Sequence, residues 1–342
     1  MASILTLGVP ETKALYVASH LRGACQNRMR NSVLVVYCIF AVPLVAQDPL
    51  ISRGFDHFYN LEYDQAIADF SSVTQKHPDD LGVWNHLAEA ILYRAMYRSG
   101  ALESQLVSGA NPFLSREKVQ IAPDDAATFD GAINHVIELS ETRLESDNDD
   151  TAALYALGIA YGLRSNYNFL VRKAWVDSLH DATGANKAHK RVCKLDPANV
   201  DARLIPGVYD YVVGSLPLGY RMLGFLAGFH GSRERGIHAL ETVARDGKVN
   251  RVDAEVLLAA IYRRERRTKE AIPLLDDLAR QFPRNYLLRF EAVQMYAELG
   301  DKQAALRELD RIRELRRAGA PGFAELSAEK IDSNQLKIEE AN

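Results

Sequence analysis

Cysteine is scarce in this chain of 342 residues, which contains only three. Two of them, Cys25 and Cys38, lie in an N-terminal segment that we expect to be removed, so Cys193 remains alone and no intramolecular disulfide can form. We interpret Cys193 as a small packed side chain rather than a reactive thiol. The core must therefore be held together by packing, which a chain of this length can achieve.

Sequence motifs of the common enzyme classes are also missing. The chain has no glycine-rich phosphate loop, no His-Glu-x-x-His, no paired-cysteine metal spacing and no Gly-x-Ser-x-Gly turn. The acidic run at residues 145–150 lacks the glycine and final glutamate of a calcium loop, and Asp150 and Thr151 are typical helix-start residues. We expect no catalysis, no cofactor and no metal, the alternative being a hydrolase formed in the irregular centre.

Positive charge is not concentrated on one stripe of the sequence. Lysine and arginine number 41 against 45 acidic residues, which gives a net charge of −4. No basic field is available for nucleic acid, and we expect no nucleic-acid partner. The compact cluster Arg263, Arg264, Arg266 and Arg267 favours a solvated turn paired with neighbouring glutamates, with an acidic-peptide site as the alternative.

Long apolar runs are rare, and the clearest one lies near the N-terminus. Residues 33–46 (VLVVYCIFAVPLVA) follow a basic stretch containing Arg30 and end at Ala46, which matches the parts of a secretory signal peptide. The run is too short to span a bilayer comfortably. We expect cleavage near Ala46 and export to the periplasm or cell envelope, with an N-terminal membrane anchor as the alternative. Translation from Met29 instead of Met1 would give a conventional signal-peptide length.

A spacing of thirty-four residues is present near the C-terminus. The positions Tyr262, Ala271, Leu275 and Leu278 are echoed by Tyr296, Ala305, Leu309 and Ile312. This period is typical of a two-helix repeat whose units bury their apolar faces by stacking. Steps of four and eight residues ending at proline recur at Ala66, Phe70, Pro78, at Ala185, His189, Pro197 and at Ala271, Leu275, Pro283. The step of four places side chains on one helical face, and proline ends the helix.

The first helices of the expected pairs carry a second pattern. Leu154, Leu157, Gly158 and Tyr161 stand at the spacing W-x2-L-G-x2-Y, followed by the A-x3-F and proline positions. This arrangement resembles the tetratricopeptide repeat (TPR) family. The resemblance implies an all-α, right-handed helical solenoid of antiparallel helix pairs. We expect small residues at Ala88, Gly158 and Ala259 to let paired helices approach closely.

The predicted organisation has three parts and two irregular insertions. The parts are an N-terminal extension with signal peptide, the solenoid, and a tail or capping helix, at residues 1–46, 47–316 and 317–342. The insertions are expected at residues 97–128 and 163–182, and an apolar segment is expected at residues 205–230. The first insertion is predicted to form a flap over one face or a disordered excursion, with a helix resuming at Asp130.

The apolar segment carries a second resemblance. Its residues Ser215, Leu216, Pro217, Gly228, Phe229, Gly231, Arg233, Glu234 and Gly236 are similar to a turn, apolar helix and turn of the eukaryotic inclusion-body-clearance family of TPR proteins. That family is associated with lipid-droplet and membrane-linked protein clearance, and the resemblance implies a shared helical architecture. For residues 212–229 we favour a buried helix pair over a membrane-touching surface.

A ligand groove in a TPR solenoid is lined by the first helix of each pair, opposite the packing positions. That periodicity predicts Phe55, Phe58, Asn85, Glu89, Tyr155, Ile159, Val256, Arg263, Phe290 and Gln294 as groove residues. They mix aromatic and polar groups and lack the concentrated pairing of lysine and asparagine that a carboxylate clamp needs. We therefore predict an exported, non-catalytic scaffold that binds an unidentified protein or peptide, the alternative being a membrane- or lipid-contacting module that uses residues 212–229.

Overall fold

The computed structural model describes residues 48–102, 117–219, 221–222 and 229–340. These residues form helices, turns and short connections without a strand, which confirms the all-α class. In chain order the elements are α1 (Pro49–Tyr59), α2 (Tyr63–Lys76), α3 (Leu81–Arg98), α5 (Pro123–Ser146), α6 (Thr151–Tyr167), the π-helix η1 (Asn168–Arg172), α7 (Trp175–Leu195), the 3-10 helix η2 (Val200–Arg203), α8 (Leu204–Gly214), α10 (Arg233–Asp246), α11 (Arg251–Arg264), α12 (Thr268–Gln281), α13 (Tyr286–Glu298), α14 (Lys302–Arg317) and α15 (Ala328–Glu340). The chain divides into two units, residues 1–46 and 47–342, and every described residue belongs to the second.

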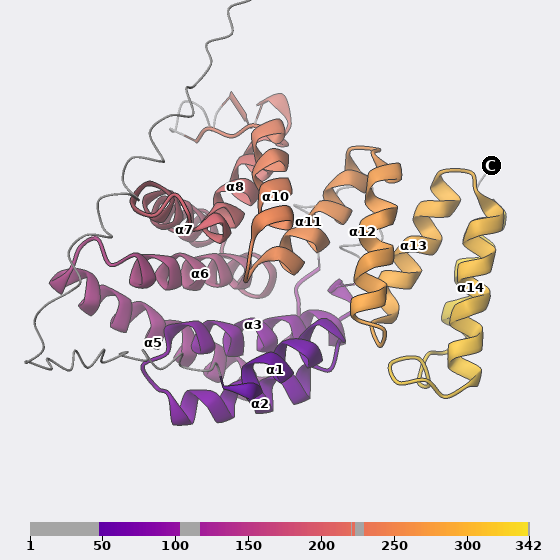
Figure 1. Cartoon of the computed structure of the whole chain (residues 1–342), viewed down its shortest axis with the longest axis horizontal. Coiled ribbons are helices and arrows are strands. Elements are labelled where there is room, and N and C mark those ends of the chain that lie inside the picture. Colours follow the sequence, from indigo (N-terminus) through magenta and orange to yellow (C-terminus); the bar gives the residue numbers. More distant parts are fainter. Residues whose placement is uncertain (1–47, 103–116, 220, 223–228, 341–342) are drawn as a thin grey trace, which may run out of the picture. The chain divides into compact units, whose positions relative to one another are not determined.

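Consecutive helices form antiparallel pairs, and each pair packs on the next (Figure 1). The pairs are α1 with α2, α3 with α5, α6 with α7, α8 with α10, α11 with α12, and α13 with α14. The second helix of a pair also contacts the first helix of the following one, as α2 does α3 and α12 does α13. Helix α15 packs on α13 and α14 and ends the array. The expected TPR-like stack of helix pairs is confirmed by this packing order.

Three of these pairs are joined by the same turn. Its central residue has a positive φ, of 66° at Leu61, 59° at Arg266 and 78° at Gly300. In each turn the next amide donates to a carbonyl five residues earlier, from Glu62 to His57, Arg267 to Tyr262 and Asp301 to Tyr296, at 2.7–3.0 Å. This hydrogen bond satisfies a carbonyl at the end of the preceding helix. The thirty-four-residue period in the side chains is therefore also a period in the backbone.

Small residues allow the close approach of helices that the sequence predicts. Ala88 and Ala259 are completely or almost completely buried. Gly158 on α6 lies against the ring of His189 on α7, and an added Cβ there would overlap that ring. The ring nitrogens of His189 each lie 3.1 Å from a backbone carbonyl oxygen, one on Tyr155 and one on Ala202. Burial lowers the His189 pKa to about 4, so the ring is neutral at pH 7 and serves the packing of α7 on α6.

The two expected insertions differ in structure. Residues 103–116 of the first lie outside the described residues, and α5 begins at Pro123, earlier than the expected Asp130, because proline suits a first helical position. Residues 163–182 form the end of α6, η1 and the start of α7. The buried carboxylate of Asp181 binds this region together, since it accepts hydrogen bonds from Arg164 at 2.7 Å and from Asn168 at 3.0 Å.

The apolar segment 205–230 comprises most of α8 and the connection that follows it. Residues 220 and 223–228, which include Gly228, lie outside the described residues. The two ends of the connection touch, because a Cβ at Gly231 would overlap Val213 and the backbone of Gly214. Val213 is buried, whereas Leu218 is exposed. No helix in the described ranges has the length and apolar character needed to cross a membrane.

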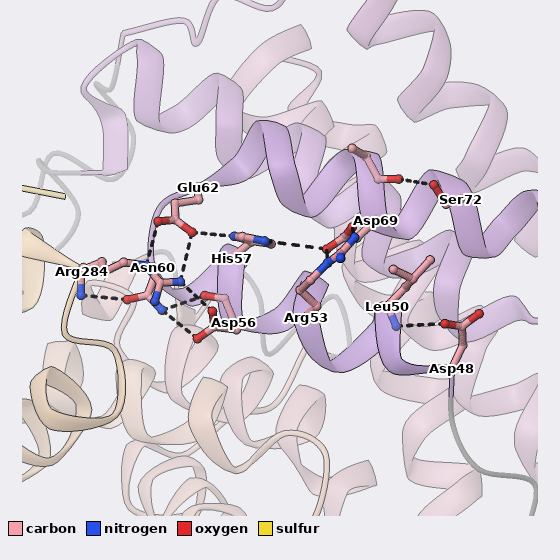
Figure 2. Close-up of polar contacts among 11 residues, drawn as sticks. Asp48, Leu50, Arg53, Asp56, His57, Asn60, Glu62, Asp69, Ser72 and Arg284 are labelled. Atoms are coloured by element: carbon pink, nitrogen blue, oxygen red, sulfur yellow. Dashed lines mark hydrogen bonds and ion pairs between the residues drawn. The ribbon is translucent and has the colours of Figure 1, made fainter. Parts of the chain in front are cut away.

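The first helix pair also contacts the turn between α12 and α13 (Figure 2). The Arg284 guanidinium pairs with Asp56 at 2.6 Å and with Glu62 at 2.7 Å, and its backbone N–H donates to Asn60 at 2.9 Å. The Asn285 amide donates to the backbone carbonyl oxygen of the last residue of α1 at 2.8 Å. These five residues, which we call the closing contact, join parts of the chain separated by more than 220 positions.

Replacing Arg266 by glycine is expected to stabilise the fold by about 0.5–1 kcal/mol. An L residue in the left-handed conformation costs about 1–2 kcal/mol, which glycine avoids. Glycine also has more conformational freedom in the unfolded chain, and this offsets part of the gain. Gly300→Arg places the same residue in the equivalent turn and should destabilise by a similar amount. Urea unfolding of both variants measures the effect, and an unchanged midpoint for either one would contradict it.

Replacing Gly158 by alanine is expected to destabilise the protein by about 1–3 kcal/mol, because the enclosed His189 ring cannot move away from the added methyl group. Gly131→Ala is the matched control, since a Cβ there meets no neighbouring atom within 4 Å. That control should instead gain about 0.5–1 kcal/mol from helix propensity. Thermal unfolding distinguishes the two, and equal changes in both variants would refute the packing role of Gly158.

Candidate binding site

Four first helices, α1, α3, α6 and α11, meet at a cluster of tyrosines and acids. The hydroxyl of Tyr59 on α1 donates to Oδ1 of Asp253 on α11 at 2.8 Å. The side chains of Glu89 and Tyr93 on α3 and Tyr155 on α6 lie within electrostatic reach of the same carboxylate. We call these five residues the acid–tyrosine recess.

The recess is poorly hydrated although solvent reaches it. All five side chains are partly exposed. Burial is nevertheless the main cause of the raised pKa values of Tyr59, Tyr93, Tyr155 and Asp253. The Asp253 pKa is raised to about 7, first by burial and then by the negative charge of Glu89. These groups are therefore desolvated by the surrounding helices although each keeps some exposure.

No basic side chain neutralises the two acids within the described part of the chain. Nδ1 of His86 lies 3.9 Å from the Glu89 carboxylate, and the hydrogen-bond partner of Asp253 is the Tyr59 hydroxyl. The tyrosines Tyr59, Tyr93 and Tyr155 lie beside the acids, and the ring of Phe55 lies 4.6 Å from that of His86. Carboxylates beside aromatic faces attract cations. The recess therefore suits a positively charged group supplied from outside.

A buried carboxylate fixes the start of α11, on which the recess depends. Asp201 in η2 accepts backbone hydrogen bonds from Lys248, Val249 and Asn250 at 2.8–3.1 Å. The Asn250 amide in turn donates to the hydroxyl of Tyr155 at 2.8 Å. These contacts hold the turn before α11 against η2 and α6, so that the first turn of α11 faces α1.

The structure separates the predicted groove residues into three groups. In the first group, Glu89 and Tyr155 belong to the recess. Phe55 borders it, because its ring centroid lies 6.1 Å from that of Tyr59. Ile159 and Val256 are partly buried and pack against the apolar cores. Whether a partner binds at these positions stays a prediction.

The second group is enclosed between helices. Phe58, Asn85 and Phe290 are 6 %, 0 % and 2 % exposed. The Asn85 amide donates to the backbone carbonyl oxygen of Ala156 at 3.0 Å, which places it between α3 and α6. Helix α15 covers Phe290, because Nζ of Lys330 lies 5.8 Å from its ring. These three side chains pack helix against helix and do not face a groove.

The third group is an internal ion-pair cluster. Arg263 is buried, with its guanidinium 2.7 Å from Glu291 and within hydrogen-bond distance of Glu298. It also donates to Gln294 at 3.0 Å, and Gln294 donates to Asn334 of α15 at 3.2 Å. Burial raises the Glu291 pKa to about 7 despite the arginine. Arg263 and Gln294 thus join α11 and α13 to the C-terminal helix.

Tyr59, Tyr93 and Asp253 are not among the groove residues that the sequence predicts. Tyr59 and Asp253 stand 194 residues apart, and nothing local connects them. Asp253 lies in the first turn of α11, where an acidic residue is expected for helix stability alone. Tyr93 could have been found, because it follows Glu89 by one helical step of four on α3.

Other chemical groups in the described residues have structural explanations. Asp150 accepts a hydrogen bond from the Ala153 amide at 2.9 Å, so it caps α6 as expected. Burial raises the pKa of the Cys193 thiol, which disfavours the reactive thiolate. In the described ranges no group of three or more His, Cys, Asp or Glu side chains is arranged to hold a metal ion.

Comparison with known proteins yields distant structural likeness only. No family model and no curated protein matches the chain. Among solved structures it is similar to a thermophilic TPR protein of Thermus thermophilus, with 14 % identity, a TM-score of 0.38, and coverage of 72 % of this chain and 96 % of that one. It is also similar to yeast Tom70, with 13 % identity, a TM-score of 0.31, and coverage of 85 % and 84 %. Both scores are below 0.5, so the architecture rests on the helix packing itself.

Replacing Asp253 by asparagine is expected to stabilise the protein by about 1–3 kcal/mol at pH 8 and by roughly a third of that amount at pH 5. The folded state holds the Asp253 proton up to about pH 7, whereas the unfolded chain loses it near pH 4, so ionisation of this group lowers stability as pH rises between those values. Asparagine removes that cost and keeps an acceptor for Tyr59.

Urea unfolding at the two pH values measures the difference. Asp79→Asn is the control, because Asp79 is exposed in the turn before α3 and its change should matter little at either pH. A variant at Asp253 that is less stable than the wild type at pH 8 would contradict the assignment of a desolvated, unneutralised acid.

Proposed function

We propose that this protein is a non-catalytic scaffold that binds a segment of another protein at the acid–tyrosine recess. The observation that carries the proposal is the pair Glu89 and Asp253, brought together from α3 and α11 without a basic partner among the described residues. An unneutralised acid in a desolvated recess is costly, and a positively charged partner group removes that cost.

The chemistry of the recess favours a segment that carries lysine or arginine. The carboxylates supply the opposite charge, and the rings of Tyr59, Tyr93 and Tyr155 supply aromatic faces for a cation. Entry of the cation ionises Asp253, whose pKa is about 7 without it. Binding therefore releases a proton and strengthens as pH rises from 6 to 8.

The same groups argue for binding rather than hydrolysis. An acyl-transfer hydrolase needs a nucleophile beside a base, and the recess as defined supplies only carboxyl and phenol groups. The tyrosine pKa values are raised, which keeps the phenols protonated at neutral pH. We accordingly propose no catalytic residue.

We also propose that the chain is exported to the periplasm or cell envelope after cleavage near Ala46. Helix α1 starts at Pro49, where Asp48 caps it by accepting from the Leu50 amide at 2.9 Å. Removal of residues 1–46 would leave this cap intact. N-terminal sequencing of the native protein tests the proposal: a start at Gln47 supports it, and a start at Met1 or Met29 contradicts cleavage and favours the anchored alternative.

A membrane contact through residues 212–229 stays a prediction. The described residues of that segment are divided, because Val213 is buried against the rest of the fold while Leu218 and Met222 are exposed. Residues 220 and 223–228 lie outside the described part.

Photo-crosslinking in the source cells tests the scaffold function. A benzoylphenylalanine at Phe55 or Tyr155 is expected to capture a protein partner, whereas the same group at Leu299, exposed in the turn between α13 and α14, is not. Combining Phe55 labelling with Glu89→Gln and Asp253→Asn should weaken capture about tenfold or more, since charged hydrogen bonds contribute about 1.5–3 kcal/mol each. Capture that is equal at Leu299, or unchanged by the double substitution, would refute the recess as the binding site.

A further inference from the structure

One exposed face of α7 combines apolar and basic side chains. Residues at helical spacing along this face are Val176, Leu179, Thr183, Lys187, Lys190 and Lys194. All six are exposed, Val176 by 81 % and Leu179 by 46 %. We call this surface the α7 face. Its first two residues are apolar and its last three are basic.

The basic half of the α7 face borders an open cavity of about 860 Å³. Lys187, Lys190 and Lys194 line it together with Tyr209 of α8 and Phe229. No carboxylate is among the described residues that line the cavity. Its electrostatic character is therefore positive in a chain whose net charge is −4.

The three lysines have no internal counter-charge in the described part of the chain. No carboxylate lies within 4.0 Å of their amino groups, although the neighbouring Arg191 pairs with Asp149 at 2.7 Å. Nζ of Lys190 lies 5.8 Å from the ring of Tyr209. Three unneutralised charges beside a cavity fit an anionic group from outside the molecule.

Exposed apolar side chains are concentrated on α7 and the connection after α8. Of the nine large ones in the described ranges, six lie on α7 or in the connection after α8: Trp175, Val176, Leu179, Leu195, Leu218 and Met222. Single exposed apolar residues are ordinary, but a group of six on neighbouring elements marks an interaction surface.

We propose that the α7 face docks on a membrane surface that contains anionic phospholipid. The phosphate of a headgroup lies among Lys187, Lys190 and Lys194, while Val176 and Leu179 contact the boundary of the acyl chains. Lysines near an anionic leaflet and apolar side chains in the interfacial zone attract the protein through separate terms. An acidic peptide in the cavity would neutralise the lysines but leave the apolar turns exposed, whereas a lipid surface contacts both. This docking is independent of the recess and goes beyond the scaffold function.

Trp175 provides a local reporter for the test. The chain has two tryptophans, and Trp84→Phe leaves Trp175, 41 % exposed at the start of α7, as the only one. Its emission in the full chain is measured with phosphatidylcholine vesicles, with and without phosphatidylglycerol. We expect a blue shift only with the anionic lipid, and a smaller one at high salt, because the attraction is screened.

Matched variants assign the effect to the α7 face. Substituting Gln for Lys187, Lys190 and Lys194 should weaken vesicle binding about 100-fold, or about fivefold per lysine. The same change at Lys248, Lys269 and Lys302, exposed on other elements, should leave it unchanged. Val176→Ser with Leu179→Ser should also reduce binding, and Val249→Ser with Leu299→Ser should not. All these variants contain residues 1–46, so any contribution of that segment to vesicle binding is the same in each of them.

Several outcomes would overturn the proposal. One is an unshifted Trp175 emission with anionic vesicles, and another is equal vesicle binding by the α7 and control lysine variants. Saturable binding of inorganic phosphate without vesicle binding would make the cavity a small-anion site. Binding of a polyglutamate peptide without vesicle binding would make it a protein site. Thermal unfolding of each variant verifies that it is folded.

Discussion

The closing contact determines where the other elements of this protein can lie. The Arg284 guanidinium, held by Asp56 and Glu62, ties the first helix pair to the turn between α12 and α13. With α1 fixed there, Tyr59 reaches Asp253 and the recess is complete. The ring of Tyr59 also lies 4.8 Å from that of Phe282, so an aromatic contact supports the ion pairs at this turn. The same contacts therefore support the fold and the position of the recess.

Features that depend on neighbouring residues could be predicted from the sequence. The spacing of Tyr262 and Tyr296 identified the repeated unit, and the structure places them before the equivalent turns at Arg266 and Gly300. The small residue at Gly158 indicated a close approach, which the His189 ring makes. Helix pairing, turns and small packing positions are local in this fold because each unit contacts mainly the next one.

Features that depend on distant elements could not be predicted. Helical periodicity assigns Asn85 and Phe290 each to one face of its helix. It does not show that α6 covers Asn85 and that α15 covers Phe290. Asp253 looks like an ordinary helix-start residue until α1 and α3 are placed beside it. The basic half of the α7 face was missed for a related reason, since its lysines are spread along a sequence that is acidic overall and gather only on one side of a helix.

The order in which the chain is synthesised gives the closing contact a further consequence. Glu62 and Arg284 are separated by 222 residues, so at roughly 5–20 residues per second the ribosome delivers α1 about 10–45 s before its partner turn exists. During that interval Tyr59 lacks the Phe282 ring and the Asp253 carboxylate that it contacts in the folded protein. The N-terminal pair of a nascent chain is consequently available to chaperones for this time, and synthesis of the turn at Arg284, rather than of any early helix, sets the moment at which the recess is complete.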